Sequence, residues 1–104
     1  MKHYLIYVTA SSKSEAITLG QSAVKSRQAA CANVLGDSTS IYWWEGEIQT
    51  DTETILILKT TSDKLEDLIS NLKKIHSYEC PCVIAIEIKN GNLDFLNWIS
   101  HEVQ

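Results

Sequence analysis

The stretch from Ser40 to Thr61 constrains the fold more than any other part of this chain, because its pattern predicts one long β-hairpin. The first arm, Ser40–Glu45, is aromatic and β-branched, which suits a pleated and half-buried surface. The second arm, Thr54–Thr60, opens with a continuous apolar run that is typical of a strand covered on both faces. A hairpin of this length overhangs a small domain, and its exposed edge therefore needs a partner.

The residues between the two arms are polar apart from Ile48, and they predict where the chain reverses. We place the turn at Gln49–Glu53, with Asp51 as the turn former. Gly46 follows three bulky side chains, and we interpret it as a β-bulge or as a close approach between backbones.

The other segments complete an alternation of strands and helices. We predict strands at His3–Thr9, Ala29–Leu35 and Cys82–Ile88, and helices that begin near Ser12, Thr61 and Asn92. We expect Ala29–Leu35 and the first hairpin arm to form one interrupted edge of the sheet, and the first and last strands to be buried. The order β-α-β-β-α-β predicts a ferredoxin-like α+β fold, an antiparallel sheet with two helices on one face and an added C-terminal helix.

Two helices carry informative local signals. Ser12 and Glu15 match the capping box, in which each side chain satisfies a backbone N–H group at the start of a helix. Gly20 lowers helix stability, so we expect it to allow close packing on the sheet. Leu68 and Leu72 lie on the amphipathic stripe of the second helix and are predicted core residues.

Length and composition limit the classes of function. The 104 residues suit a single domain, residues 1–104, and the net charge of −4 argues against a nucleic-acid partner. No apolar run approaches the ~20 residues that span a bilayer, so we expect no membrane partner. The three cysteines and the absence of a signal-peptide pattern indicate a reducing, cytoplasmic setting. No phosphate loop, nucleophile elbow or HExxH motif appears, and we expect no enzymatic activity.

One cluster has the composition of a metal site. His76, Glu79, Cys80 and Cys82 lie close together in sequence, and imidazole with thiolate suits copper or zinc. Cys80 and Cys82 would share a face of an extended strand, at a separation that two ligands of one ion tolerate. The alternative is that both thiols are packing residues, since free cysteine is often buried.

The aromatic arm of the hairpin has two interpretations. Alternation along a strand sets Tyr42 and Trp44 on one face, and Trp43 and Glu45 on the other. Aromatic side chains beside a carboxylate line ligand clefts, and they also fill permanent subunit interfaces. Lys59 follows the buried run, and it would face an anionic ligand, pair with Glu45 or extend into solvent.

Five segments together resemble the CutA family of divalent-cation tolerance proteins. They are Ala29–Val34, Thr39–Gly46, Leu58–Thr61, His76–Pro81 and Gly91–Ile99. The resemblance covers nearly the whole chain in order. It implies a ferredoxin-like subunit, a tight homotrimer, a cytoplasmic location, and a link to copper and other divalent metals. It also implies a fold similar to that of the PII signalling proteins.

The chain departs from the family pattern at positions that bear on metal binding. Ser77 replaces the first proline of the family's His-Pro-Tyr motif, which here continues with Tyr78, and Cys82 replaces a glutamate. Val8 and Ile75 stand where some members carry a cysteine and a second histidine. A copper site built on those family ligands is therefore not carried over intact.

Two hypotheses of different classes follow. The first is a homotrimeric divalent-cation tolerance protein that binds copper or another divalent metal ion without catalysis. The second is a PII-like signalling module that binds a small anionic ligand in a cleft between subunits. We group Tyr78 with the hairpin aromatics and Lys59 as candidates for such a cleft or for the trimer interface.

Overall fold

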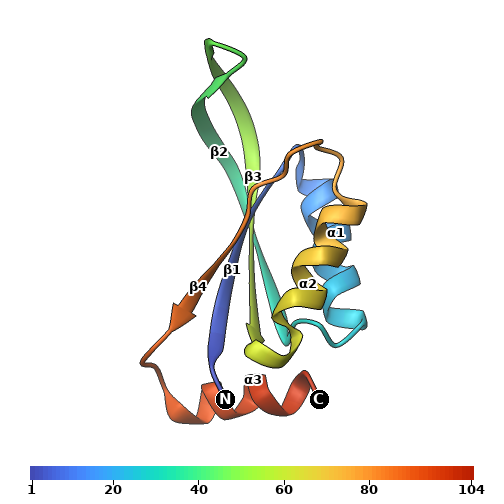
Figure 1. Cartoon of the computed structure of the whole chain (residues 1–104), viewed down its shortest axis with the longest axis vertical. Coiled ribbons are helices and arrows are strands. Elements are labelled where there is room, and N and C mark those ends of the chain that lie inside the picture. The colour runs from blue at the N-terminus through green and yellow to red at the C-terminus, as the bar shows by residue number, and fades with distance from the viewer.

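The computed structural model describes all 104 residues and shows a four-stranded antiparallel sheet with three helices. The elements are β1 (His3–Ala10), α1 (Lys13–Lys25), β2 (Cys31–Trp44), β3 (Glu47–Thr61), α2 (Ser62–Ile75), β4 (Val83–Ile88) and α3 (Leu93–Glu102). The strands follow the order β2-β3-β1-β4, and α1 and α2 lie together on one side of the sheet (Figure 1). The ferredoxin-like prediction, with its C-terminal helix, is confirmed.

The core lies between the sheet and the pair of helices. Its buried members are Ile6, Val8, Ala10, Ala16, Leu19, Ala23, Ala29, Leu56, Leu58, Leu68 and Leu72. A Cβ atom at Gly20 would lie 3.1 Å from the Ala32 Cβ and 3.2 Å from the Leu56 Cδ1, so α1 packs closely on the sheet at this point. The predicted role of Gly20 is confirmed, because a Cβ atom there would press against the Ala32 and Leu56 side chains.

The start of α1 uses both polar residues of the predicted capping box, with one difference. The Ser12 hydroxyl accepts a hydrogen bond from the Glu15 N–H at 3.1 Å. The Glu15 carboxylate accepts bonds from the N–H and the hydroxyl of Ser11, each at 2.9 Å, and not from Ser12. Glu15 is therefore held one residue further back than in the standard motif.

The hairpin turn lies elsewhere than predicted. β2 and β3 stay paired as far as Trp44 and Glu47, which leaves Glu45 and Gly46 as a two-residue turn. Both have positive φ, 50° and 81°, as the hairpin turns that match strand twist require. The predicted turn at Gln49–Glu53 is wrong, and Gly46 serves the turn and not a bulge.

The prediction of an interrupted edge strand is confirmed. β2 runs without a break in strand structure from the short segment into the aromatic arm, and its register with β3 shifts between Leu35 and Ser38. Gly36 and Asp37 lie in this β-bulge. A bulge bends its strand and increases the local twist, so it redirects the second half of the hairpin.

The distal half of the hairpin projects beyond the helices (Figure 1). It gives the chain an elongated shape, with extents of 44 × 25 × 22 Å. Ile41 and Trp43 are 70% and 71% exposed, and Ile48, which is paired with Trp43, is also exposed. Apolar side chains that project this far have no covering partner within the chain.

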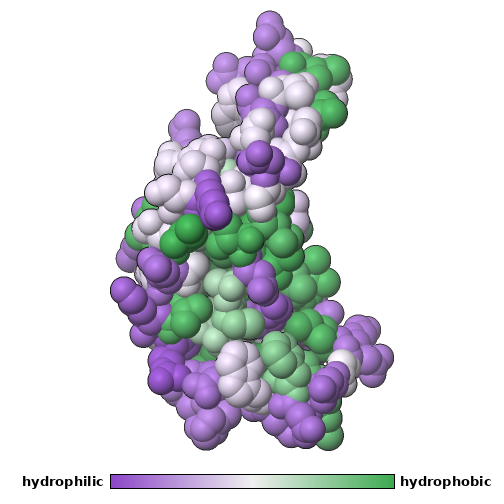
Figure 2. Space-filling view, turned by 180° about the vertical axis from the view of Figure 1, so that it is seen from behind, coloured by the Kyte–Doolittle hydropathy of each residue, from purple (hydrophilic) through white to green (hydrophobic).

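The side of the sheet opposite α1 and α2 also carries exposed apolar residues, and we call it the open sheet face. Cross-strand pairing joins Leu5 to Ile86, Tyr7 to both Ile84 and Ile57, and Ile55 to Leu35. Directly paired residues project to the same face of a sheet. Figure 2 shows apolar surface gathered across the middle of the molecule, below the hairpin.

The prediction that the last strand is buried is wrong for the single chain. β4 pairs only with β1 and forms an edge of the sheet. Ile84 and Ile86 are 51% and 52% exposed because neither α1 nor α2 covers their side of the sheet. A continuous apolar run is typical of a strand covered on both faces, whereas Ile84–Glu87 of β4 are exposed on both faces in the single chain.

Candidate functional site

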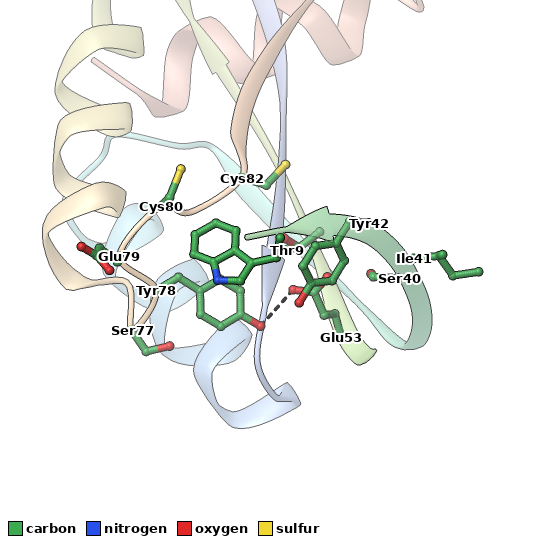
Figure 3. Close-up of a pocket in the computed structure, with 11 residues that line it drawn as sticks. Thr9, Ser40, Ile41, Tyr42, Glu53, Ser77, Tyr78, Glu79, Cys80 and Cys82 are labelled. Atoms are coloured by element: carbon green, nitrogen blue, oxygen red, sulfur yellow. Dashed lines mark hydrogen bonds between the residues drawn. The ribbon is translucent and has the colours of Figure 1, made fainter. Parts of the chain in front are cut away.

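A cleft of 690 Å³ opens between the hairpin and the segment that joins α2 to β4 (Figure 3). It is lined by Thr9, Ser40, Ile41, Tyr42, Trp44, Glu53, Ser77, Tyr78, Glu79, Cys80 and Cys82. Thr9 is paired with Ile55 of the open sheet face, so the cleft adjoins that face. The lining includes carboxylates, thiols and aromatic rings, but no lysine, arginine or histidine.

Glu53 supplies a buried negative charge to the cleft. The residue is only 8% exposed, and its carboxylate accepts a hydrogen bond of 2.9 Å from the Tyr78 hydroxyl. Burial raises the pKa of Tyr78, and the bond and charge of Glu53 raise it further, so the phenol stays protonated and donates. No basic side chain lies within 4 Å of the Glu53 carboxylate.

The aromatic residues come from two separate parts of the chain. Tyr42 and Trp44 project from β2, while Tyr78 belongs to the segment after α2. Trp43 does not line the cleft, so the predicted alternation holds for Tyr42, Trp43 and Trp44, whereas Glu45 lies in the turn. The Tyr42 hydroxyl donates to the Asp51 carboxylate, and that bond raises the pKa of Tyr42.

Two thiols line the cleft beside these rings. Cys80 is exposed and Cys82 is partly buried, and neither takes part in a disulfide. Burial raises the pKa of the Cys82 thiol, although a hydrogen bond with Thr9 acts in the opposite direction. The third cysteine, Cys31, begins β2 and is paired with Lys59, away from the cleft.

His76 is buried beside the cleft and both of its ring nitrogens are engaged. Nε2 lies 2.8 Å from the carbonyl oxygen of Thr9, which only accepts, so Nε2 carries a proton. Nδ1 accepts the Tyr78 N–H at 3.0 Å, and it therefore carries none. The Glu15 carboxylate lies 3.8 Å from Nδ1, but this approach is an ion pair only if Nδ1 is protonated. Through these two contacts the ring fixes the segment that carries Tyr78 to the end of β1.

The structure brings together six of the ten residues singled out from the sequence. Tyr42, Trp44, Tyr78, Glu79, Cys80 and Cys82 line one cleft. Trp43 and Glu45 lie at the hairpin end, and His76 lies behind the lining. Lys59 donates to the side chain of Asn33 and contributes nothing to the cleft. No group of three or more His, Cys, Asp or Glu side chains is arranged to hold a metal ion.

Sequence reasoning missed Glu53, which it assigned to the hairpin turn. Thr9, Ser40, Ile41 and Ser77 were also missed as lining residues. The available signal was the position of Glu53 two residues before the apolar run Ile55–Leu58, where a carboxylate enters the buried part of a strand.

Glu15 links the start of α1 to the segment after α2. Besides the bonds from Ser11, its carboxylate accepts the Ser77 N–H at 2.8 Å. Burial alone would raise the pKa of Glu15, but the hydrogen bonds from Ser77 and Ser11 outweigh it and lower the pKa from 4.5 to about 2. The carboxylate thus supports the outer wall of the cleft.

Protonation of Glu15 is expected to weaken the fold at acidic pH. A folded-state pKa below the unfolded value gives a stabilisation that is complete above pH 4.5 and is lost as the pH falls towards 2. Glutamine does not titrate, so Glu15→Gln should lose less unfolding free energy than the unaltered protein as the pH falls from 4.5 towards 2. We expect a difference of about 1 kcal/mol, because solvent screens the charge of Glu15. Denaturant titrations across this pH range measure it. The exposed Glu66→Gln is the control, and equal pH profiles for Glu15→Gln and the unaltered protein would contradict the assignment.

Comparison with known proteins places the chain in a family. Residues 4–102 match the family model described as CutA1 divalent ion tolerance protein. A chloroplastic CutA 1 protein of Oryza sativa is 40% identical over 100 residues, covering 96% of this chain and 56% of the rice protein. This chain therefore spans about half of that relative's length.

Solved structures agree with this result. That of the periplasmic divalent cation tolerance protein CutA of Archaeoglobus fulgidus is 39% identical, with a TM-score of 0.94 over 98% of this chain and 99% of that one. CutA of Xylella fastidiosa is 32% identical, with a TM-score of 0.96 over 100% of both chains. By sequence and by fold, this chain belongs to the CutA1 divalent ion tolerance protein family.

Proposed function

We propose that the protein is a homotrimer that binds divalent metal ions, copper among them, in the cleft, and that it has no catalytic role. The observation that carries the proposal is the charge of the lining. Glu53 and Glu79 contribute carboxylates, and no basic side chain in the lining balances them. Cys80 and Cys82 add thiols, which bind a metal ion once they lose their protons. A cleft of one sign attracts counter-ions and raises their local concentration.

The thiols of Cys80 and Cys82 are the metal ligands that we propose for one chain. Thiolate sulfur favours copper and zinc over harder cations such as magnesium and calcium. His76 supports the site from behind and is not a ligand in this arrangement, because a metal ion would have to displace one of its two hydrogen bonds. Since one chain does not group three ligands, water or a neighbouring copy would complete the coordination.

The rival hypothesis of a small anionic ligand has less support. Lys59, the basic residue singled out for that role, lies outside the cleft and is bonded to Asn33. An anion entering the cleft would meet the buried charge of Glu53 without a compensating cation.

The open sheet face and the hairpin support the trimer. Ile84, Ile86 and Leu35 leave about half of their surface uncovered on this face. β4 also presents an unpaired edge, and such an edge forms strand pairs readily with another chain. Packing of further copies against this face would bury it, and the number three follows the resemblance to CutA.

A reducing compartment suits the three unpaired cysteines, and we propose the cytoplasm. None of the three helices is long and apolar enough to cross a membrane.

Calorimetric titration of the native protein with zinc tests the metal proposal, and zinc is chosen because it has no redox chemistry. The double variant Cys80→Ser/Cys82→Ser should bind zinc at least about tenfold more weakly, a change of about 1.4 kcal/mol. Cys31→Ser is the matched control and should bind as the unaltered protein does. Unchanged affinity in the double variant, or heat from ATP but not from zinc, would reject the proposal.

A further inference from the structure

The floor of the cleft has a composition that metal binding does not explain. Glu53 is only 8% exposed. Its one hydrogen bond comes from the phenol of Tyr78, which carries no charge. Buried carboxylates in proteins are normally paired with a cation. Here no cation of the chain is within reach, although the carboxylate borders a cavity open to solvent.

Aromatic side chains surround this carboxylate. Tyr78 bonds to it directly, and in the view of Figure 3 the carboxylate lies between the rings of Tyr78 and Tyr42. The bond to Asp51 is the main cause of the raised pKa of Tyr42, and the charge of Glu53 adds to it. Trp44 adds the third ring to the lining.

We propose that the cleft binds an organic ammonium ion, held by the charge of Glu53 and by the aromatic surfaces of Tyr42, Trp44 and Tyr78. The electron-rich faces of aromatic rings attract cations, and rings grouped near one site recognise alkylated ammonium groups. The volume of 690 Å³ is that of a small-molecule site, which spans roughly 300–1,000 Å³, and exceeds what a bare ion fills.

Glu53 and the rings suit an organic cation better than a metal ion. A metal ion needs several oxygen, nitrogen or sulfur donors around it, whereas the hydrogen-bond partner of the Glu53 carboxylate is a single phenol. Both phenol protons are already donated to carboxylates, which leaves the rings as the exposed aromatic surface. An alkylammonium ion combines a single positive charge with an apolar periphery, and it matches both parts of this surface.

The inference uses the same cleft as the proposed function but different residues. Metal binding depends on Cys80 and Cys82, whereas the ammonium site depends on Glu53 and the rings. The double cysteine variant should therefore lose zinc affinity and keep ammonium affinity. Failure of either proposal can be recognised without the other.

The test is calorimetric titration of the native protein with choline and with its uncharged isostere 3,3-dimethylbutan-1-ol. Choline should give saturable binding. The isostere has the same shape but lacks the positive charge of choline, so it should bind at least about tenfold more weakly. Equal binding of the two compounds, or no binding of choline up to about 10 mM, would overturn the proposal. This comparison needs no substitution, so it holds even if a variant fails to fold.

Variants then assign the residues. Glu53→Gln keeps a hydrogen-bond acceptor for Tyr78 and removes the charge, and it should weaken choline binding at least about tenfold. Trp44→Leu should weaken binding, whereas Trp43→Leu, the same change on the neighbouring residue outside the cleft, should leave it unaltered. Equal effects of the two tryptophan variants, or full affinity in Glu53→Gln, would place choline elsewhere and refute the site.

Discussion

Replacing Ile86 with aspartate is expected to separate the proposed trimer into single chains. Ile86 lies on the open sheet face and is 52% exposed in the isolated chain, so the single subunit tolerates a polar residue there. In the assembly the same carboxylate would be buried without a partner, which costs several kcal/mol. Sedimentation should show the mass falling from three times 11.7 kDa to that of one chain.

Ile75→Asp is the matched control for this prediction. Ile75 is 48% exposed, but it lies at the end of α2, on the other side of the sheet. The control should remain a trimer at micromolar protein, and circular dichroism should show both variants folded. A monomeric unaltered protein, or an unchanged trimer in Ile86→Asp, would contradict assembly through the open sheet face.

Leu72→Ala is expected to lower the free energy of unfolding by about 2–5 kcal/mol, because it opens a cavity in a closely packed core. Leu72 is 1% exposed and lies on α2 between the helix pair and the sheet. Leu93→Ala provides the comparison, since Leu93 is 69% exposed and should change stability by less than about 0.5 kcal/mol.

Denaturant unfolding at one fixed protein concentration measures both leucine variants, because assembly makes apparent stability depend on concentration. Similar losses in Leu72→Ala and Leu93→Ala would show that the stripe on α2 does not face the core.

Periodicity predicted the elements well where one physical requirement dominates. The stripe containing Leu68 and Leu72 fixed the buried face of α2, and both residues are fully buried. The hairpin turn was missed because two signals competed. The polar run around Asp51 looks like a loop, but positive φ at Glu45 and Gly46 decides where the chain reverses.

Burial of β4 was mispredicted for a related reason. A continuous apolar run predicts that both faces of a strand are buried. It does not show whether the same chain or another chain buries them. Only the fold shows that Ile84 and Ile86 are left uncovered by the single chain.

The site was predictable only in part. Alternation correctly separated Trp44 from Trp43, because side-chain direction along a strand is a local property. The burial of Glu53 depends on the register between β3 and β2 and on the approach of Tyr78, which are tertiary features. For His76, composition indicated a metal ligand. In the fold, its ring nitrogens contact the backbone of Thr9, which is distant in sequence, and of Tyr78. These contacts form only when the chain folds, so the sequence alone does not show them.

The central claim is that the cleft binds cations through its thiols and carboxylates. A crystal of the native protein soaked in zinc, with diffraction data collected at the zinc absorption edge, tests it most directly. We predict an anomalous peak inside the cleft, within coordination distance of Cys80 or Cys82, in every copy of the chain. Peaks confined to surface residues outside the cleft, such as His101, or no peak at all, would contradict the claim.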